Sequence, residues 1–424
     1  MTIDQGRGNR SMTDTVSTHD TVTALMDQIA GIGQDPLRGG YSRPVFSTSE
    51  IDLREWFIAQ AQRRGLDVHT DRNGVIWAWW DVPGASRFNA VVTGSHLDSV
   101  PGGGPFDGPL GVASALVAVD LLKAQGVVPQ RPLAIAVFPE EEGSRFGRPC
   151  LGSLLMTGSI DPDTVRNLRD QEGNTFADVA AAHGVDPRFV GRDEEALSLI
   201  GTFVELHVEQ GRGLIDLDRP VAIGSSIVSH GRWRFSVHGQ GNHAGTTLMA
   251  DRKDPMVAAA RIVVDIRETA KRQPQARATV GRLQPVPGGT NVIASRVDFW
   301  LDVRHPEDAV TAGLVETILH HAQQVAAEEG CRVELHEESL SPTVHFDKPL
   351  EHQLRRWLPE APVLDTGAGH DAGVLAASVP TAMLFVRNPS GISHSPEEHV
   401  EDADAEIGAA ALAKVMGELS VQTP

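Results

Sequence analysis

The chain of 424 residues has only two cysteines, Cys150 and Cys331, too few for a disulfide framework. Such sparse cysteine is typical of a reducing compartment. Basic residues are also scarce, since 37 Lys and Arg stand against 56 Asp and Glu, giving a net charge of −19. A nucleic-acid backbone is bound by clustered Lys and Arg, so this composition argues against a nucleic-acid partner.

Long apolar runs are absent as well. The most apolar stretch, residues 110–122, is interrupted by Asp120 and is too short for a bilayer, which needs about 20 residues. The first 20 residues are polar and contain no apolar core of a signal peptide. We therefore expect a disordered N-terminus over residues 1–20, no membrane association and a cytoplasmic location.

The chain does contain helical patterns that alternate with short buried-strand patterns. Helices are expected at residues 51–64, ending at Gly65, and at residues 108–126. Strands are expected at four apolar runs: residues 88–95, 132–138, 202–206 and 380–386. Strands separated by helices predict an α/β fold, with a mostly parallel sheet covered by helices on both faces.

The segment 225–337 has a different order of elements. A strand precedes a helix that starts with Asp254 as N-cap and Pro255 at its first position. Two strands, a helix at 307–329 and a last strand follow, which is the β-α-β-β-α-β order of a ferredoxin-like unit. We expect two domains: residues 21–224 with 338–424 form the main domain, and 225–337 form an insertion.

Four polar clusters follow four of the predicted core strands. They are residues 95–98 with Asp107, residues 140–142, residues 207–210, and residues 393–394. Ligands bind outside the carboxyl ends of the strands in open α/β sheets, so these clusters should meet in one crevice. Imidazoles with carboxylates suit zinc, manganese or cobalt. There are enough of them for two ions bridged by one carboxylate, and Asp107, between two turn-forming prolines, is our choice.

Each cluster, considered alone, also fits a purely structural role without a metal ion. The run of three glutamates fits a solvated acidic turn, and His96 alone fits a hydrogen-bonded structural histidine. If the run is extended, Glu140 and Glu142 face one way and Glu141 the other, so that one serves as ligand and a neighbour as base. Four such clusters at four strand ends favour the metal site.

At these residues the sequence resembles a known family. The strings GSHLDSV (94–100), FDG (106–108), EEGSRF (141–146) and HVEQG (207–211) resemble the M20-type metallo-amidohydrolases. Within that family they resemble the branch of N-carbamoyl-L-amino-acid hydrolase, β-ureidopropionase and allantoate amidohydrolase. The resemblance runs from about Thr21 to the C-terminus and implies a metallopeptidase-like α/β fold with a mixed, mostly parallel sheet and an inserted ferredoxin-like domain.

The resemblance implies a centre of two divalent metal ions, zinc first, with manganese, cobalt or nickel as alternatives. The implied ligands are His96, Asp107 as bridge, Glu142, His207 and His394, the last in GISHSPEE (391–398). Glu141 is implied as general base. Asp98 is implied to orient the catalytic glutamate or a ligand imidazole, which is also what a metal-bound histidine requires physically.

The insertion and the loops carry a second implied set, for the substrate. His243 is implied to hold the scissile carbonyl, typically from the partner subunit of a homodimer. Arg304 is implied to bind the substrate carboxylate. Three further residues are implied to lie near the substrate: Asn291, Arg232 and Gln210. The insertion is then a lid and dimerisation domain, and its closure should complete the site.

The implied reaction is hydrolysis of the C–N bond of a ureido (N-carbamoyl) group on a small carboxylate. The alternatives are an M20-type metallopeptidase or deacylase acting on dipeptides or N-acyl amino acids, and a non-catalytic binding protein of the same fold. Leu248, Ala294 and Arg212 stand where the family commonly has proline, and 230–232 also departs from its pattern. These departures leave allantoate, N-carbamoyl-α-amino acids and β-ureido acids open as substrates.

Overall fold

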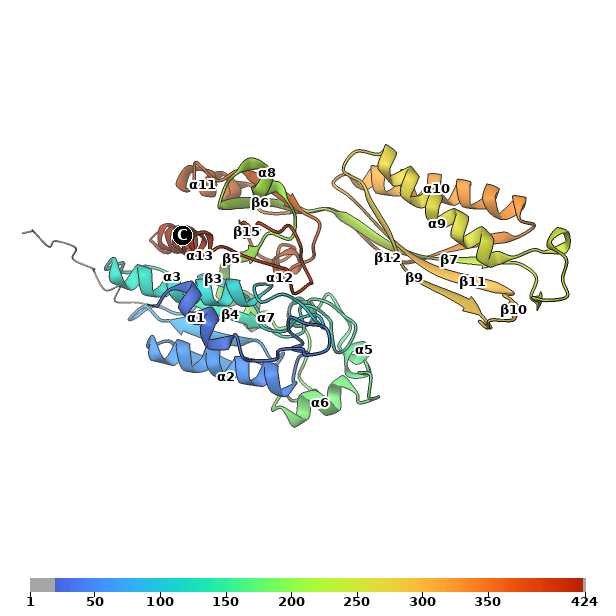
Figure 1. Ribbon diagram of the computed structural model, residues 1–424. Coiled ribbons are helices and arrows are strands. Elements are labelled where there is room, and N and C mark those ends of the chain that lie inside the picture. Colours follow the sequence, from blue (N-terminus) through green and yellow to red (C-terminus); the bar gives the residue numbers. More distant parts are fainter. Residues whose placement is uncertain (1–19, 422–424) are drawn as a thin grey trace, which may run out of the picture.

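A computed structural model describes residues 20–421. It contains a large unit built on a nine-stranded sheet and a small unit built on a four-stranded sheet with two helices (Figure 1). The disorder expected for the N-terminus concerns residues that, apart from Asp20, lie outside the described range. No helix among residues 20–421 is both long enough and apolar enough to cross a membrane.

The large sheet has the order β1-β2-β4-β3-β5-β15-β6-β13, with β14 paired to β6. Its strands are β1 (Asp67–Thr70), β2 (Ile76–Trp80), β3 (Ala90–His96), β4 (Leu133–Phe138), β5 (Ile200–Val208), β6 (Val221–Ile227), β13 (Val344–His345), β14 (Val363–Thr366) and β15 (Thr381–Val386). The central strands β4, β3, β5 and β15 are parallel, while β1, β2 and β13 join their neighbours antiparallel. The four predicted core strands are these central ones, so the prediction is confirmed.

Helices cover both faces of the large sheet, as expected. One face packs against α1 (Val22–Ile29), α2 (Thr48–Arg63), α3 (Pro109–Ala124), α11 (Lys348–Trp357) and α13 (Asp402–Ser420). The other face packs against α4 (Leu151–Thr157), α7 (Glu194–Leu199) and α12 (Asp371–Leu375). The short helices α5 (Pro162–Arg166), α6 (Phe176–Ala182) and α8 (Gly213–Leu217) lie in the connections. The apolar residues that fill both layers hold the central strands, and hence their carboxyl ends, in place.

The small unit has the chain order β-α-β-β-α-β. Its strands β7 (Ser229–His238), β9 (Arg277–Val286), β11 (Arg296–His305) and β12 (Arg332–Ser341) form an antiparallel sheet in the order β12-β7-β11-β9. Helices α9 (Pro255–Arg272) and α10 (Asp308–Glu328) join them. Helix α9 starts as expected, because the Asp254 carboxylate accepts a hydrogen bond from the Met256 amide at 2.9 Å.

One face of the small sheet is apolar and the other is polar. On β11, Val297, Phe299, Leu301 and Val303 are buried in a cluster with residues of α9 and α10. Side chains on the opposite face lie toward the large unit near the ends of β9 and β11. A two-stranded ribbon of β8 (Asn242–His243) and β10 (Val292–Ile293), followed by a 3-10 turn at Met249–Asp251, lies at the remote end of the unit (Figure 1). We propose that this unit, residues 229–341, is the inserted domain expected at 225–337.

The approach of β3 to β4 gives a stability prediction. Gly94 is opposite Ala136, and a Cβ atom at position 94 would lie 1.9 Å from the Ala136 carbonyl oxygen. Gly94→Ala should therefore force the two central strands apart and lower the free energy of unfolding by about 3 kcal/mol, measured by chemical denaturation. Gly281→Ala in β9 is the matched control, because a Cβ there meets no atom within 4 Å. Equal stability of the two variants would contradict the prediction.

Candidate metal centre

Three of the predicted ligands meet at the carboxyl ends of the parallel strands. The Asp107 Oδ1 atom lies 3.5 Å from His96 Nε2 and 3.2 Å from His207 Nε2. Both imidazole Nε2 atoms are buried and have no hydrogen-bond partner among the described residues. Buried polar atoms are rarely left without partners, so the three groups fit a divalent cation held between them.

The other oxygen of Asp107 faces a second set of ligands. Its Oδ2 atom lies 3.4 Å from His394 Nε2, which in turn lies 3.3 Å from Glu142 Oε2. His394 is half exposed and has a positive φ of 57°, a backbone conformation that is uncommon for residues other than glycine. Asp107 is the residue common to both sets. The structure thus brings all five predicted ligands together around one carboxylate.

The ring tautomers also suit metal binding. His96 Nδ1 is 3.0 Å from the Asp98 carbonyl oxygen, and His207 Nδ1 is 2.9 Å from the Val208 carbonyl oxygen. A ring that donates from Nδ1 to a carbonyl leaves Nε2 as the atom with the free lone pair. In both residues this is the atom that faces Asp107. The donor set therefore fits a divalent metal in chemistry as well as in position.

Charge in the centre is strongly unbalanced toward the acidic side. Burial raises the pKa of Glu142 well above its usual range, and the nearby Asp107 charge adds to this. Burial alone would lower the pKa of His96, yet the surrounding carboxylates, Glu141 foremost, raise it well above its usual range. Divalent cations would offset this crowding of negative charge.

Two backbone features allow the ligands to come so close. Gly108, at the start of α3, has φ of 86°, and a Cβ atom there would lie 2.5 Å from the His96 ring. Only glycine therefore permits this approach. The Glu398 Oε1 atom accepts hydrogen bonds from the amides of Phe106 and Asp107 at 2.9 and 3.0 Å, which fixes the loop that carries Asp107.

Asp98 links the histidine strand to the glutamate loop. Its Oδ1 and Oδ2 atoms accept hydrogen bonds from the amides of Glu141 and Glu142, both at 3.1 Å. The same Oδ1 atom lies 3.6 Å from His96 Nδ1. One buried carboxylate thus fixes the backbone of both glutamates relative to His96. These contacts reach both groups that the resemblance names as alternatives, the catalytic glutamate and a ligand imidazole.

Glu141 lies in the centre without belonging to either ligand set. Its Oε2 atom is 3.6 Å from His96 Nε2, and its Oε1 atom accepts a hydrogen bond from Cys150 Sγ at 3.4 Å. Burial raises the pKa of Glu141 well above its usual range. A buried carboxyl group beside the metal ligands is suited to accept and return a proton.

A buried polar layer behind the centre was missed by the sequence analysis. The His370 ring lies 4.5 Å from the His207 ring, and neither of its nitrogens has a partner among the described residues. Glu205 accepts hydrogen bonds from Ser95 Oγ and the Ala372 amide, both at 3.0 Å. His370 follows β14 as the predicted clusters follow their strands. Strand β14 has only four residues and was not recognised, so this fifth strand-end cluster was not found either.

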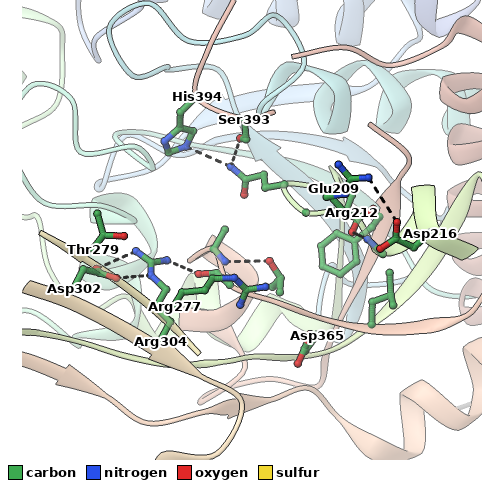
Figure 2. Close-up of a pocket in the computed structure, with 18 residues that line it drawn as sticks. Glu209, Arg212, Asp216, Arg277, Thr279, Asp302, Arg304, Asp365, Ser393 and His394 are labelled. Atoms are coloured by element: carbon green, nitrogen blue, oxygen red, sulfur yellow. Dashed lines mark hydrogen bonds and ion pairs between the residues drawn. The ribbon is translucent and has the colours of Figure 1, made fainter. Parts of the chain in front are cut away.

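A cavity of about 910 Å³ joins the metal centre to the small unit. Figure 2 shows Ser393 and His394 at one side of it and Asp302 with Arg304 at the other. Gln210, also in the wall, donates from Nε2 to Asp107 Oδ2 at 2.8 Å and to Ser393 Oγ at 3.0 Å. The cavity can therefore hold a small molecule with one end at the ligands and the other at the arginines.

The predicted substrate residues of the small unit divide into two groups. Arg304 lines the cavity and donates to the Asp302 oxygens at 2.8 and 3.1 Å, while Arg232 lies 3.5 Å from Asp302 just beyond the wall. His243 and Asn291 are exposed in the ribbon at the remote end of the small unit (Figure 1). The structure does not bring this second pair to the metal centre of the same chain.

Comparisons with known proteins identify the family of the chain. Residues 92–418 match the model of peptidase family M20/M25/M40. The chain is 34% identical to the N-carbamoyl-L-amino acid amidohydrolase of Geobacillus stearothermophilus and 32% identical to the allantoate amidohydrolase of Escherichia coli K12, each match covering 93% of this chain and 96% of the relative. The crystal structure of a hydantoinase/carbamoylase-family amidase from Burkholderia multivorans superposes with a TM-score of 0.82 at 30% identity, covering 95% of this chain and 98% of the other.

The buried layer gives a prediction for the pH dependence of stability. Burial, with the Glu205 charge adding to it, raises the pKa of Asp371 from 3.8 to about 8. Between these two pH values the folded state binds one more proton than the unfolded state. The contribution of this carboxyl group to the free energy of unfolding is therefore complete below about pH 4 and is lost as the pH rises toward 8. Asp371→Asn removes this proton. Between pH 5 and 8, the free energy of unfolding of this variant should fall less steeply than that of the wild type. The two slopes should differ by about 1.4 kcal/mol per pH unit.

The measurement is urea unfolding of the chelator-treated protein at pH 5, 6, 7 and 8. Asp52→Asn is the control, because Asp52 is exposed on α2 and its replacement should leave the curve unchanged. Parallel curves for wild type and Asp371→Asn would show that the Asp371 carboxyl does not stay protonated in the folded protein.

Proposed function

The chain belongs to peptidase family M20/M25/M40, and from this membership we propose that it is a metal-dependent amidohydrolase that cleaves the C–N bond of a ureido group on a small carboxylate. The observation that carries the proposal is the shared Asp107 carboxylate, with one ligand set on each oxygen and Glu141 beside it. Relatives that match over 93% of the chain bear the names of N-carbamoyl-L-amino acid and allantoate amidohydrolases, which supports the ureido group as the reacting group.

The centre would hold two divalent ions, with zinc as the first candidate and manganese, cobalt or nickel as alternatives. His96, Asp107 and His207 would hold one ion, and Asp107, Glu142 and His394 would hold the other. When bound, such ions would activate a water molecule and polarise the carbonyl group under attack. Asp107 has the central role in this assignment because it belongs to both ligand sets.

Glu141 is the general base. Its Oε2 atom takes the proton of the attacking water and returns it to the leaving nitrogen, a role that contributes about 10²–10⁴-fold in rate. Asp98 positions this carboxyl group through the Glu141 amide. Cys150, which donates to Oε1, leaves Oε2 as the oxygen that faces the ligands.

Arg304, Gln210 and Arg232 hold and orient the substrate. Arg304 binds the substrate carboxylate at the end of the cavity away from the ligands, and Gln210 lies beside His394 at the other end. Arg232 supports Arg304 through their common partner Asp302. An orientation fixed at both ends brings the ureido carbon to the reacting water.

His243 completes the site from a second copy of the chain, together with Asn291. The Gly245 amide donates to His243 Nδ1 at 3.0 Å, so the ring proton is on Nε2, free to donate to a developing oxyanion. His243 is exposed at the remote end of the small unit, where another subunit can be reached. The small unit is therefore a lid and dimerisation domain of a homodimer, and its movement closes the cavity.

The two alternative functions expected from the sequence are less well supported. A peptidase or deacylase of the same family would use the same ligands, but the relatives at 34% and 32% identity are amidohydrolases of ureido compounds by name. A non-catalytic binding protein would not need a base beside a full set of ligands. A cytoplasmic location is also proposed, on the ground that both cysteines are free.

The assigned roles predict that two neighbouring glutamates behave differently. Glu141→Gln should keep both metal ions, measured by elemental analysis, but lose turnover of N-carbamoyl amino acids and allantoate by about 10³-fold. Glu142→Gln, its matched control, should lose about one metal ion per chain. If Glu141→Gln still releases ammonia, the assignment of Glu141 as general base is wrong. If the wild-type enzyme stays active after its metal is removed by a chelator, the metal-dependent mechanism is wrong.

The contribution of His243 from a partner predicts complementation between inactive variants. His243→Ala and Glu141→Gln should each be inactive alone, but refolding them together should restore part of the activity. A mixed dimer contains one site with an intact Glu141 and an intact His243 of the partner subunit. Mixing without any recovery would place His243 in the site of its own chain, or outside the site altogether.

A further inference from the structure

The polar face of the small sheet carries an excess of positive charge where it borders the cavity. Arg277 on β9 is directly opposite Arg304 on β11, and Arg232 on β7 is directly opposite Asp302. Asp302 is the carboxylate that pairs with two of these arginines. Two guanidinium groups thus share one carboxylate, and the third, that of Arg277, forms no ion pair within residues 20–421. Three positive charges therefore stand against one negative charge at this edge of the sheet.

Arg304 is already largely engaged. Its Nε and Nη2 atoms donate to the two oxygens of Asp302, and its Nη1 atom donates to the Gly367 carbonyl oxygen. Three of its five N–H groups are therefore used, including the forked edge that binds a carboxylate best. One edge of the Arg304 guanidinium group remains free to donate hydrogen bonds, which is enough to orient a single carboxylate.

Arg277 is not engaged in this way. Its side chain forms no hydrogen bond or ion pair with another residue of the range 20–421, and it lines the cavity. Its Nη1 atom reaches the same loop as Arg304, since a Cβ atom at Gly367 would lie 3.6 Å from it. Like charges directly opposite each other on neighbouring strands are destabilising, which an anion bound between them would relieve.

The acidic residues of the cavity wall do not neutralise Arg277. The Glu209 carboxylate accepts hydrogen bonds from the amides of Gly213 and Leu214 at 2.6 and 2.9 Å, and Asp216 pairs with Arg212 at 3.8 Å. Asp365, on the large unit, forms no ion pair with Arg277 in the described structure. Arg277 is exposed in the cavity wall, where an acidic group of a bound molecule can pair with it.

We propose that Arg277 is a specificity-determining residue that binds a second acidic group of the substrate. The preferred substrates are then ureido dicarboxylates, that is, N-carbamoyl derivatives of acidic amino acids, with one carboxylate at Arg304 and the other at Arg277. Cα atoms of directly opposite residues are about 4.5–5.5 Å apart, a separation that two carboxylates on one short carbon chain can span. This inference rests on the proposed ureido hydrolysis and names its substrate class.

The test compares N-carbamoyl-L-aspartate with N-carbamoyl-L-asparagine, which differ by a charged carboxylate against a neutral amide of equal size. The wild-type enzyme with metal should show a kcat/KM about tenfold higher for the acid, the loss expected when one charge-assisted hydrogen bond is missing. Arg277→Gln should abolish this preference through a higher KM for the acid. Its kcat/KM for the asparagine derivative should stay within about twofold of wild type.

Arg212→Gln is the matched control, because Arg212 lines the same cavity but is paired with Asp216. It should keep the preference for the acid. The glutamate and glutamine derivatives repeat the comparison with a side chain that is longer by one methylene.

Each outcome decides a different claim. No preference for the acid in either pair, or an equal loss on acid and amide in Arg277→Gln, overturns the role of Arg277 while ureido hydrolysis stands. Failure of the metal-loaded wild type to hydrolyse any of the four compounds overturns the substrate class, and failure on allantoate as well overturns the proposed function.

Discussion

The arrangement of this protein depends on one shared carboxylate. Asp107 faces His96 and His207 with one oxygen and His394 with the other, so a single side chain connects residues delivered by three separate strand ends. A carboxylate can do this only if its backbone is fixed, and Glu398 fixes it by accepting both neighbouring amides. The parallel central strands supply the convergence, and the loops after them supply the chemistry.

Burying several carboxylates costs free energy of desolvation, which hydrogen bonds to these groups offset. Asp98 accepts two amides and Glu205 accepts a hydroxyl and an amide, so that these carboxyl groups hold the ligand loops as well as adding charge. Burial also raises the pKa of the Asp371 carboxyl group to about 8, because it disfavours the charged form. Structure behind the ligands thus sets the charge that bound metal would balance.

The sequence alone predicted the parallel centre of the sheet because each central strand is an apolar run followed directly by polar residues. It predicted the order of the small unit because Asp254 and Pro255 mark a helix start and β11 alternates clearly. It did not predict β14, which is short, and so it missed His370 and Asp371. Nor did it predict the engagement of Arg304 by Asp302 or the position of Arg277, because both depend on the register between strands that are distant in the chain.

The polar residues of the small unit form two separate groups because they lie at opposite ends of its sheet. Arg304 and Arg277 stand at the ends of β11 and β9 nearest the large unit and reach the cavity of their own chain. His243 and Asn291 stand in the ribbon at the opposite end and cannot serve that cavity without another subunit (Figure 1). A sheet strand of ten residues spans about 33 Å, which is far more than a side chain can bridge. Under the proposed roles, carboxylate recognition would be local to each chain, whereas stabilisation of the reacting carbonyl would require a second copy of the chain. The choice of substrate would then be separate from the completion of the site.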